Sequence, residues 1–467
     1  MKAKFWTMAS GSYKIDPESL HSFLTENGFY SYKPQNVKTT ILVHVENRKV
    51  RQVTKKEIRE FCWRFIENEY QFSGGEERKQ VKLEFHKNKS FFSPDNLQLL
   101  PEIEIREIKD TKDMSLLFFN NCILEITKDG VTKKEYDEFE GHVFETDIID
   151  RDLKNVTKDP SQVSGVFKRF LNDISRAETI EGTFHNYQSI ISIMGYMLHR
   201  FKNPGNAKAV ILMDTYKNEK ANGGTGKGII CKALDKVRKS AFIDGKFFQS
   251  SNRFSFANVD YGTRILVFDD VPQNFDFEKL FPVITEKALV ERKYENPYEI
   301  PFEDSPKIIL STNYAIMDQG ESDKRRKVEF VLSDTFNSKY TPEDKYGHLF
   351  FTEWDSDEWD QFYNLMAHAI RLYLKKGITK PKTDTAERKA IMSSTEKVVR
   401  FFHANIDFSV KYDKKEFHKR FYKEHPEHMK VEPTTFRHWL KAIADAYGYG
   451  FHESHSGDKN FFQITPE

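Results

Sequence analysis

The stretch Asn222-Gly223-Gly224-Thr225-Gly226-Lys227-Gly228 lies between an apolar run at 207–214 and a helix-forming segment at 229–239. A strand, a glycine-rich loop and a helix in this order are typical of a phosphate-binding loop. Glycines let backbone N–H groups turn toward phosphate oxygens, and the helix N-terminus adds partial positive charge. We expect all seven residues to bind nucleotide, with Lys227 reaching the β- and γ-phosphates.

The loop departs from the usual pattern at both ends. Ala221 stands where the first glycine is expected, and Gly228 stands where a Ser or Thr usually binds Mg²⁺. Mg²⁺ would then take another oxygen in its place, such as water. Taken by itself, the stretch also fits a flexible glycine loop before a helix.

Two further polar motifs follow apolar runs. The run at 264–270 ends in Asp269-Asp270, the Walker B arrangement. There Asp269 would hold Mg²⁺, while Asp270 would orient or deprotonate the attacking water. Asn313 ends a third apolar run, where a polar side chain would contact the γ-phosphate or the water. Solvated acids at a strand end and a turn-forming Asn are the alternative interpretations.

Arg325 and Arg326 follow in the string SDKRRKVEF (322–330). A guanidinium placed at the γ-phosphate stabilises transition-state charge, although an isolated basic run is more often a solvated surface. The order of Lys227, the aspartate pair, Asn313 and the arginines within about 100 residues decides the matter. The sequence therefore predicts an NTP-hydrolysing enzyme.

Composition excludes several other classes of protein. The 467 residues suggest two to four domains, and 72 Lys+Arg against 71 Asp+Glu exclude a polycationic coat protein. The cysteines Cys62, Cys122 and Cys231 form no CxxC pair, so neither a disulfide scaffold nor a cysteine zinc site is expected. We find no signal sequence, and the apolar stretch 189–201 is too short to span a bilayer. A cytoplasmic protein without a membrane partner is expected.

The pattern of runs predicts a multidomain α/β protein. We expect an α+β module at 1–95 and a helical and β-rich module at 96–205. An ATPase with a mostly parallel sheet follows at 206–378, because short apolar runs alternate there with helices. A linker at 377–384 leads to the last module, at 385–467.

That last module has winged-helix order. Helices are expected at 414–425 and 432–448, with Thr434 or Thr435 capping the second, and a β-hairpin wing at 450–466. The residues expected to face DNA are Arg437, His438 and Lys441 on the second helix and Lys459 on the wing. A winged helix that binds protein and makes no DNA contact is the alternative.

The motif order resembles the superfamily 3 helicases of the AAA+ class, found in small DNA viruses, poxvirus-type primase-helicases, phages and plasmids. The strings LHRFKNPGNAKAVILMD (198–214) and FFTEWDSDEWDQFYNLM (350–366) are similar to phage and plasmid members. The resemblance covers roughly 100–375. It implies a homo-hexameric ring with 96–205 as an oligomerisation collar, ATP between subunits, and Arg326 acting on the neighbour's ATP, with Arg325 in reserve.

The resemblance also implies a pore hairpin at 285–306. Its basic residues Lys287, Arg292 and Lys293 would grip single-stranded or forked DNA without reading sequence, with Lys293 as the best match. An ordinary exposed hairpin is the alternative, since Glu291 and Glu295 balance its charge.

Together these features predict an ATP- and Mg²⁺-dependent DNA helicase in the replication system of a phage or mobile element. It would work in a bacterial cell or phage-infected host, with any primase or polymerase on a separate chain. A nucleotide-switched DNA-binding initiator or loader that does not unwind DNA is the second hypothesis, favoured by Gly228. A monomeric metabolic kinase is the third, and the absence of an acceptor-site signature disfavours it.

Overall fold

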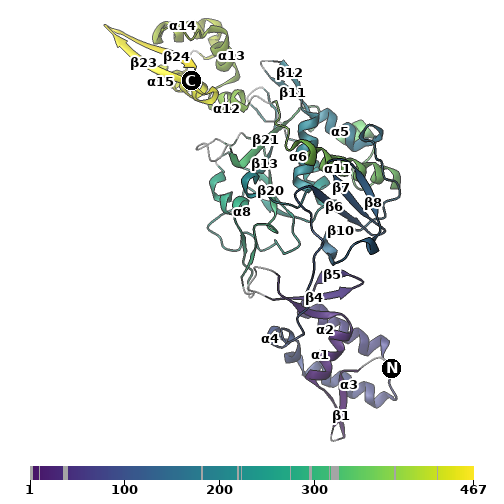
Figure 1. Cartoon of the computed structure of the whole chain (residues 1–467). Coiled ribbons are helices and arrows are strands. Elements are labelled where there is room, and N and C mark those ends of the chain that lie inside the picture. The colour runs from purple at the N-terminus through teal and green to yellow at the C-terminus, as the bar shows by residue number, and fades with distance from the viewer. Residues whose placement is uncertain are drawn as a thin grey trace.

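A computed structural model describes residues 4–466 apart from 10, 35–39, 180–181, 218–219, 222, 274, 294–296, 315, 317–324, 383–384 and 429. The chain is a multidomain mixed α/β protein. Its N-terminal module lies at one end and its C-terminal helices and hairpin at the other, with the main sheet between them (Figure 1). Within the described residues, no helix is both long enough and apolar enough to cross a membrane.

The N-terminal module is built around an aromatic core. Phe5, Trp6, Phe23 and Phe65 are all at most 2% exposed. Two helices pack on this core, α1 and α2, and a π-helical turn at Phe65–Glu69 continues α2. The elements are β1 (Trp6–Ala9), β2 (Ser12–Ile15), α1 (Pro17–Glu26), β3 (Phe29–Tyr32), β4 (Ile41–Glu46), β5 (Lys49–Gln52), α2 (Lys55–Arg64), α3 (Gly75–Lys87) and α4 (Pro94–Leu97).

The next module mixes helices with short strands. The stretch 161–202 contains a hairpin between two helices. The short segment at Asn120-Asn121 divides the apolar stretch 115–127 into two paired strands. The elements are β6 (Met114–Phe119), β7 (Ile123–Thr127), β8 (Val131–Lys134), β9 (Val143–Phe144), β10 (Ile148–Ile149), α5 (Val166–Ile174), β11 (Arg176–Thr179), β12 (Gly182–His185) and α6 (Tyr187–Leu198).

The expected parallel sheet is confirmed and has five strands in the order β16-β17-β20-β13-β21. Parallel strands end at one edge, so β20 brings its last residues between those of β13 and β17. The elements of this region are β13 (Ala209–Asp214), β14 (Tyr216–Lys217), β15 (Lys220–Ala221), α7 (Lys227–Asp235), β16 (Ser240–Asp244), β17 (Ile265–Val271), α8 (Phe281–Thr285), β18 (Ala288–Val290), β19 (Tyr298–Ile300), β20 (Lys307–Thr312), β21 (Lys327–Leu332), α10 (Pro342–Tyr346) and α11 (Ser356–Lys376).

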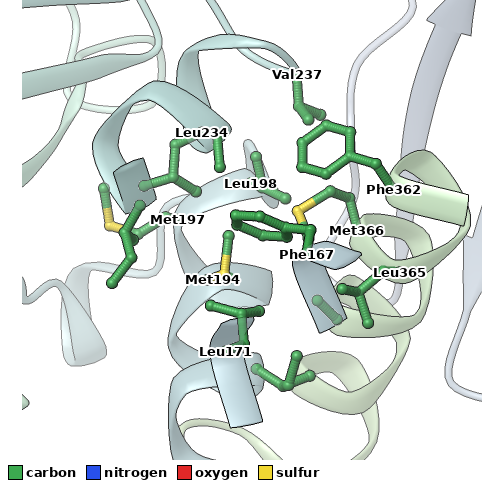
Figure 2. Close-up of a cluster of buried hydrophobic side chains, with 14 of the residues drawn as sticks. Phe167, Leu171, Met194, Met197, Leu198, Leu234, Val237, Phe362, Leu365 and Met366 are labelled. Atoms are coloured by element: carbon green, nitrogen blue, oxygen red, sulfur yellow. The ribbon is translucent and has the colours of Figure 1, made fainter. Parts of the chain in front are cut away.

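Helices α5, α6, α7 and α11 pack together beside this sheet. Figure 2 shows Phe167 among side chains of α6 and α11, including Met194 and Met366. The same cluster contains Val210 of β13 and Leu117 of β6. The modules expected at 96–205 and 206–378 therefore share one hydrophobic core.

A buried charge network crosses the same junction. Asp147 accepts hydrogen bonds from Arg264 at 2.9 and 2.8 Å and from Arg200 at 3.0 Å. All three side chains are at most 8% exposed, and Glu107 completes the group. Burial alone raises the pKa of Asp147, but the two arginines hold it well below its ordinary value.

The C-terminal module has its own core, which includes Phe417, Phe436 and Ile464. Two helices and a hairpin with Gly457-Asp458 at its turn follow the predicted order. The expected threonine cap is wrong: α15 begins after Glu432, and no side chain caps it. The elements are α12 (Thr385–Ser393), α13 (Glu396–Asn405), β22 (Tyr412–Asp413), α14 (Lys414–Glu424), α15 (Pro433–Tyr447), β23 (Tyr449–Ser456) and β24 (Lys459–Pro466).

Candidate functional site

Lys227 lies at the carboxyl edge of the parallel sheet. It is the first residue of α7, and its Nζ donates to Asn313 Oδ1 at 2.9 Å at the end of β20. The ammonium also forms an ion pair with Asp214, the last residue of β13. Burial lowers the pKa of Lys227, and Asp214 offsets part of that effect. Lys227 thus presents a largely buried ammonium, 12% exposed, between a carboxylate and an amide oxygen.

The loop before α7 depends on glycine at two positions. Gly224 has φ +89° and Gly226 has φ +109°, in the left-handed region that other residues rarely adopt. A Cβ on Gly226 would lie 2.6 Å from Cζ of Phe170, a ring carried by α5. Gly223 and Gly228 face open space, and Asn222 lies outside the described residues.

Thr225 and Asp214 close the loop. The Thr225 hydroxyl donates to Asp214 Oδ1, and both side chains are buried. The other carboxylate oxygen, Asp214 Oδ2, is buried without a hydrogen-bond partner among the described residues. Asp214 therefore orients the loop through Thr225 and the ammonium of Lys227 at the same time.

Asp269 and Asp270 lie in a bulge of β17 and not at its very end. The pairing of β17 with β20 shifts register between Phe268 and Val271. Asp270 has φ +54°, a strained conformation that such bulges impose. Ser311 fixes the pair, because its hydroxyl donates to Asp269 Oδ1 at 2.5 Å and accepts from the Asp270 amide at 2.9 Å.

Lys246 pairs with Asp270 at the exposed side of the site. Its Nζ lies 2.5 Å from Asp270 Oδ2, and this contact raises the pKa of Lys246. Lys246 follows β16, the neighbour of β17, so the topology brings it to the same edge. The carboxylate of Asp270, which the sequence assigns to water activation, is thus paired with an exposed cation.

The residues present suit Mg²⁺ only with help from water and substrate. The described residues contain no cluster of three His, Cys, Asp or Glu side chains able to hold a metal. Gly228 supplies no hydroxyl, and the Thr225 hydroxyl is engaged by Asp214. Mg²⁺ commonly binds one or two carboxylates and completes its shell with water and phosphate oxygens. Asp269 is the carboxylate that fits this role.

Arg325 and Arg326 lie at the opposite end of the sheet from Lys227. They precede β21, which runs parallel to β13 with Lys327 opposite Ala209 and Leu332 opposite Asp214. Six residues of strand separate the two ends by about 17 Å. Arg326 is half-buried with its guanidinium 4.5 Å from the centre of the Phe281 ring, and Arg325 is exposed.

The three basic residues of the expected pore hairpin have different surroundings. β18 and β19 pair as an antiparallel hairpin, as expected for 285–306. Lys287 forms an ion pair with Glu299 at 2.7 Å. Arg292 donates to the carbonyls of Ala257 and Val259, both at 2.8 Å, whereas Lys293 is exposed.

The four residues expected to face DNA in the C-terminal module also differ. Arg437 and Lys459 line a groove of about 600 Å³ between α14, α15 and the hairpin. Glu453 accepts from Arg437 Nε at 2.7 Å, and Arg437 and Lys414 hold the pKa of Glu453 at about 2. His438 and Lys441 are exposed on α15.

Five residues at the site were not indicated by the sequence motifs. They are Asp214, Lys246, Ser311, Phe170 and Arg388. Asp214 ends an apolar strand, which is a signal that sequence reasoning could use. The others reach the site only through strand order or packing between modules, as with Arg388 NH2, which donates to the Asn313 carbonyl at 3.0 Å.

A family model described as "Family of unknown function (DUF5906)" matches residues 220–326. This range contains the glycine loop, the aspartate pair, Asn313 and both arginines. No curated protein sequence matches this chain significantly.

Three solved structures can be superposed on the chain at low similarity. The apo NrS-1 C-terminal region gives a TM-score of 0.42 and 14% identity, over 97% of this chain and 100% of that one. JCV helicase gives 0.28 and 11%, over 60% and 65%. A full-length MCM homolog from Methanopyrus kandleri gives 0.21 and 10%, over 70% and 68%.

Proposed function

We propose that this chain is an ATP-dependent DNA helicase of the superfamily 3 AAA+ type. The observation that supports it best is the meeting of these groups at the end of β20: Lys227 donates to the side chain of Asn313, and Ser311 holds the bulged aspartates of the next strand. ATP would bind with its phosphates in the 222–228 loop. Lys227 would neutralise the β- and γ-phosphates, and Asp270 would orient the water.

Mg²⁺, held by Asp269 and phosphate oxygens, would supply Lewis-acid stabilisation of the charge that develops on the phosphates. Asp270 must leave Lys246 before it can accept a proton from water. Because Lys246 is 60% exposed, its ion pair is weakly held and can exchange.

The opposite location of Arg326 supports a ring. A guanidinium at the far end of β21 cannot reach phosphate at Lys227 of the same chain, about 17 Å away. A neighbouring subunit of a homo-hexamer would bring its Arg326 to this phosphate, with 96–205 as the collar. Arg325 is the second candidate for this role.

DNA would pass the β18–β19 hairpin, with exposed Lys293 as the first candidate to contact phosphate. In the winged-helix interpretation of 385–467, His438 and Lys441 are open to duplex DNA, whereas Arg437 is engaged by Glu453. Single-stranded or forked DNA is the proposed substrate, and a primase or polymerase would be a separate partner.

Substitution of Lys227 tests the nucleotide site. Lys227→Ala should lower ATP hydrolysis by about 100-fold or more, since it removes the cation nearest the transferred phosphate. Lys232→Ala, an exposed lysine of the same helix, is the matched control. ATP hydrolysis in the Lys227→Ala variant at the level of Lys232→Ala would reject the assignment.

A nucleotide-switched loading platform is the second candidate. Gly228 provides no hydroxyl for Mg²⁺, and Asp270 is paired with Lys246, so slow hydrolysis would fit this role. Strand displacement on forked DNA with 3′ and 5′ tails separates the two candidates. Tight ATP binding without displacement would favour the platform.

A further inference from the structure

Helix α12 lies where the C-terminal module meets the main sheet. Its consecutive residues Glu387, Arg388 and Lys389 are 8%, 4% and 9% exposed. Charged side chains are seldom buried to this extent unless their positions are fixed by specific contacts. This burial indicates that α12 is packed between the C-terminal module and the main sheet.

The apolar residues of α12 belong to two cores. Ala390 and Ile391 lie in the core of the C-terminal module, where α12 packs against α15. Met392 packs against the hydrophobic cluster on the sheet, which includes Ile211 and Leu310. A helix is stiff, so a shift at one of these contacts moves the whole of α12.

Arg388 connects α12 to the candidate nucleotide site. Its NH2 donates to the carbonyl of Asn313 at 3.0 Å, and the Asn313 side chain accepts from Lys227 at 2.9 Å. Burial lowers the pKa of Lys227, and the positive charge of Arg388 lowers it further, because the two cations repel each other. An anion bound beside Lys227 would relieve that repulsion and attract the guanidinium.

The segment before α12 is tied to α6. Asn186 Nδ2 donates to the Lys382 carbonyl at 3.0 Å, and the Lys382 amide donates to Asn186 Oδ1 at 2.8 Å. The Thr379 amide donates to Ser192 Oγ at 2.9 Å. With this anchor fixed, a displacement of Arg388 turns α12 and carries α15 with it.

We propose that Arg388 is a positioning residue of the nucleotide site and that, through α12, it couples phosphate bound at Lys227 to the orientation of the C-terminal module. The inference rests on the proposed nucleotide site. Arg388 acts by holding Asn313 in place and by following the charge of the γ-phosphate. The C-terminal module thus takes up one orientation with ATP and another without it.

Distance measurement between two spin labels tests the coupling in the full-length protein. The native cysteines Cys62, Cys122 and Cys231 are buried, so labels at Lys236→Cys and Asp458→Cys would react selectively. Labelled protein is diluted into excess unlabelled protein, so that one protomer is observed at a time. Distances are recorded with Mg²⁺ alone and with saturating Mg²⁺ and a non-hydrolysable ATP analogue.

The unsubstituted protein should change its label distance when the analogue binds. Arg388→Gln should bind the analogue within about threefold of normal affinity yet show no change in distance. Its kcat should fall by about tenfold, with KM little altered, because Asn313 is no longer held. Arg388→Lys should recover part of both effects, since it keeps the charge but not the planar fork.

The control variants separate coupling from simple destabilisation. Arg400→Gln removes an exposed arginine of the same module and should leave distance and kcat unchanged. Ile391→Ala loosens α12 from the C-terminal core and should abolish the distance change while kcat is retained. A folded Arg388→Gln protein that still changes its distance on binding would overturn the proposal, as would an unsubstituted protein that binds the analogue without any change.

The same measurements distinguish a failure of the proposed nucleotide site from a failure of the coupling. If the unsubstituted protein binds no analogue, or binds it equally after Lys227→Ala, the nucleotide site itself is wrong and the coupling falls with it. If Lys227→Ala alone abolishes binding but Arg388→Gln behaves normally, only the coupling is wrong.

Discussion

Replacement of Gly226 by alanine is the sharpest test of how the loop is built. An alanine at φ +109° meets a backbone penalty of about 1–2 kcal/mol. Its Cβ would lie 2.6 Å from Phe170 Cζ, about 1 Å inside normal contact, which adds about 1–3 kcal/mol of overpacking. Phe170 is fully buried between Phe336 and Phe350, so it has little room to retreat. Gly226→Ala should therefore lower the free energy of unfolding by about 2–5 kcal/mol.

Denaturant unfolding and binding of a fluorescent ATP analogue measure this effect. Gly223→Ala is the control for stability, because its Cβ meets nothing within 4 Å, so the change should stay below about 0.5 kcal/mol. Adding Phe170→Leu to Gly226→Ala should recover about 1–2 kcal/mol of coupling in a double-mutant cycle. Equal stability of the two glycine variants, or strictly additive effects with Phe170→Leu, would refute the reasoning.

Two further predictions concern a missing hydroxyl and a buried lysine. Gly228→Ser should raise Mg²⁺-dependent ATP hydrolysis by about tenfold relative to Gly228→Ala, because both fit the open space but only serine offers Mg²⁺ an oxygen; equal kcat values would contradict this. Burial lowers the pKa of Lys202 to about 7, so between pH 7 and 10.5 the unfolded chain binds more protons and stability should rise with pH. Lys202→Met should raise Tm at pH 7 despite losing the bond to Ser305, with a smaller gain at pH 10; parallel Tm curves would contradict the shift.

Local patterns in the sequence were sufficient to predict the strands and the helix of the site. The apolar run before the glycine loop is β13, and the helix expected at 229–239 is α7, which begins two residues earlier, at Lys227, and ends at Asp235. The run ending in Asn313 is β20, which lies between β13, the strand before the glycine loop, and β17, the strand that carries the aspartates. The short hairpin β14–β15 between strand and loop was not expected, since its two-residue strands carry no periodic signal.

The remaining features depend on contacts between distant segments. The bulge at Asp269-Asp270 arises from the pairing of β17 with β20, and a strand's own sequence does not specify its register with a neighbour. Phe170 reaches Gly226 only because α5 packs beside α7. Arg388 lies in a segment whose charged residues resemble a solvated surface, and its burial arises only when α12 docks on both cores.

The two junctions of the main sheet are held by different kinds of contact. On the N-terminal side, Asp147 is held by Arg200 and Arg264, and loss of one partner from such a buried group costs about 3–5 kcal/mol. On the C-terminal side, Arg388 donates a charged hydrogen bond to the carbonyl of Asn313, and a bond of this kind is worth about 1.5–3 kcal/mol. If Arg388 donated to a phosphate oxygen in place of the Asn313 carbonyl, the new hydrogen bond would be at least as strong. In the coupling that we propose, phosphate binding would turn α12 and leave the Asp147 network closed, so that motion at Lys227 would reach the C-terminal module.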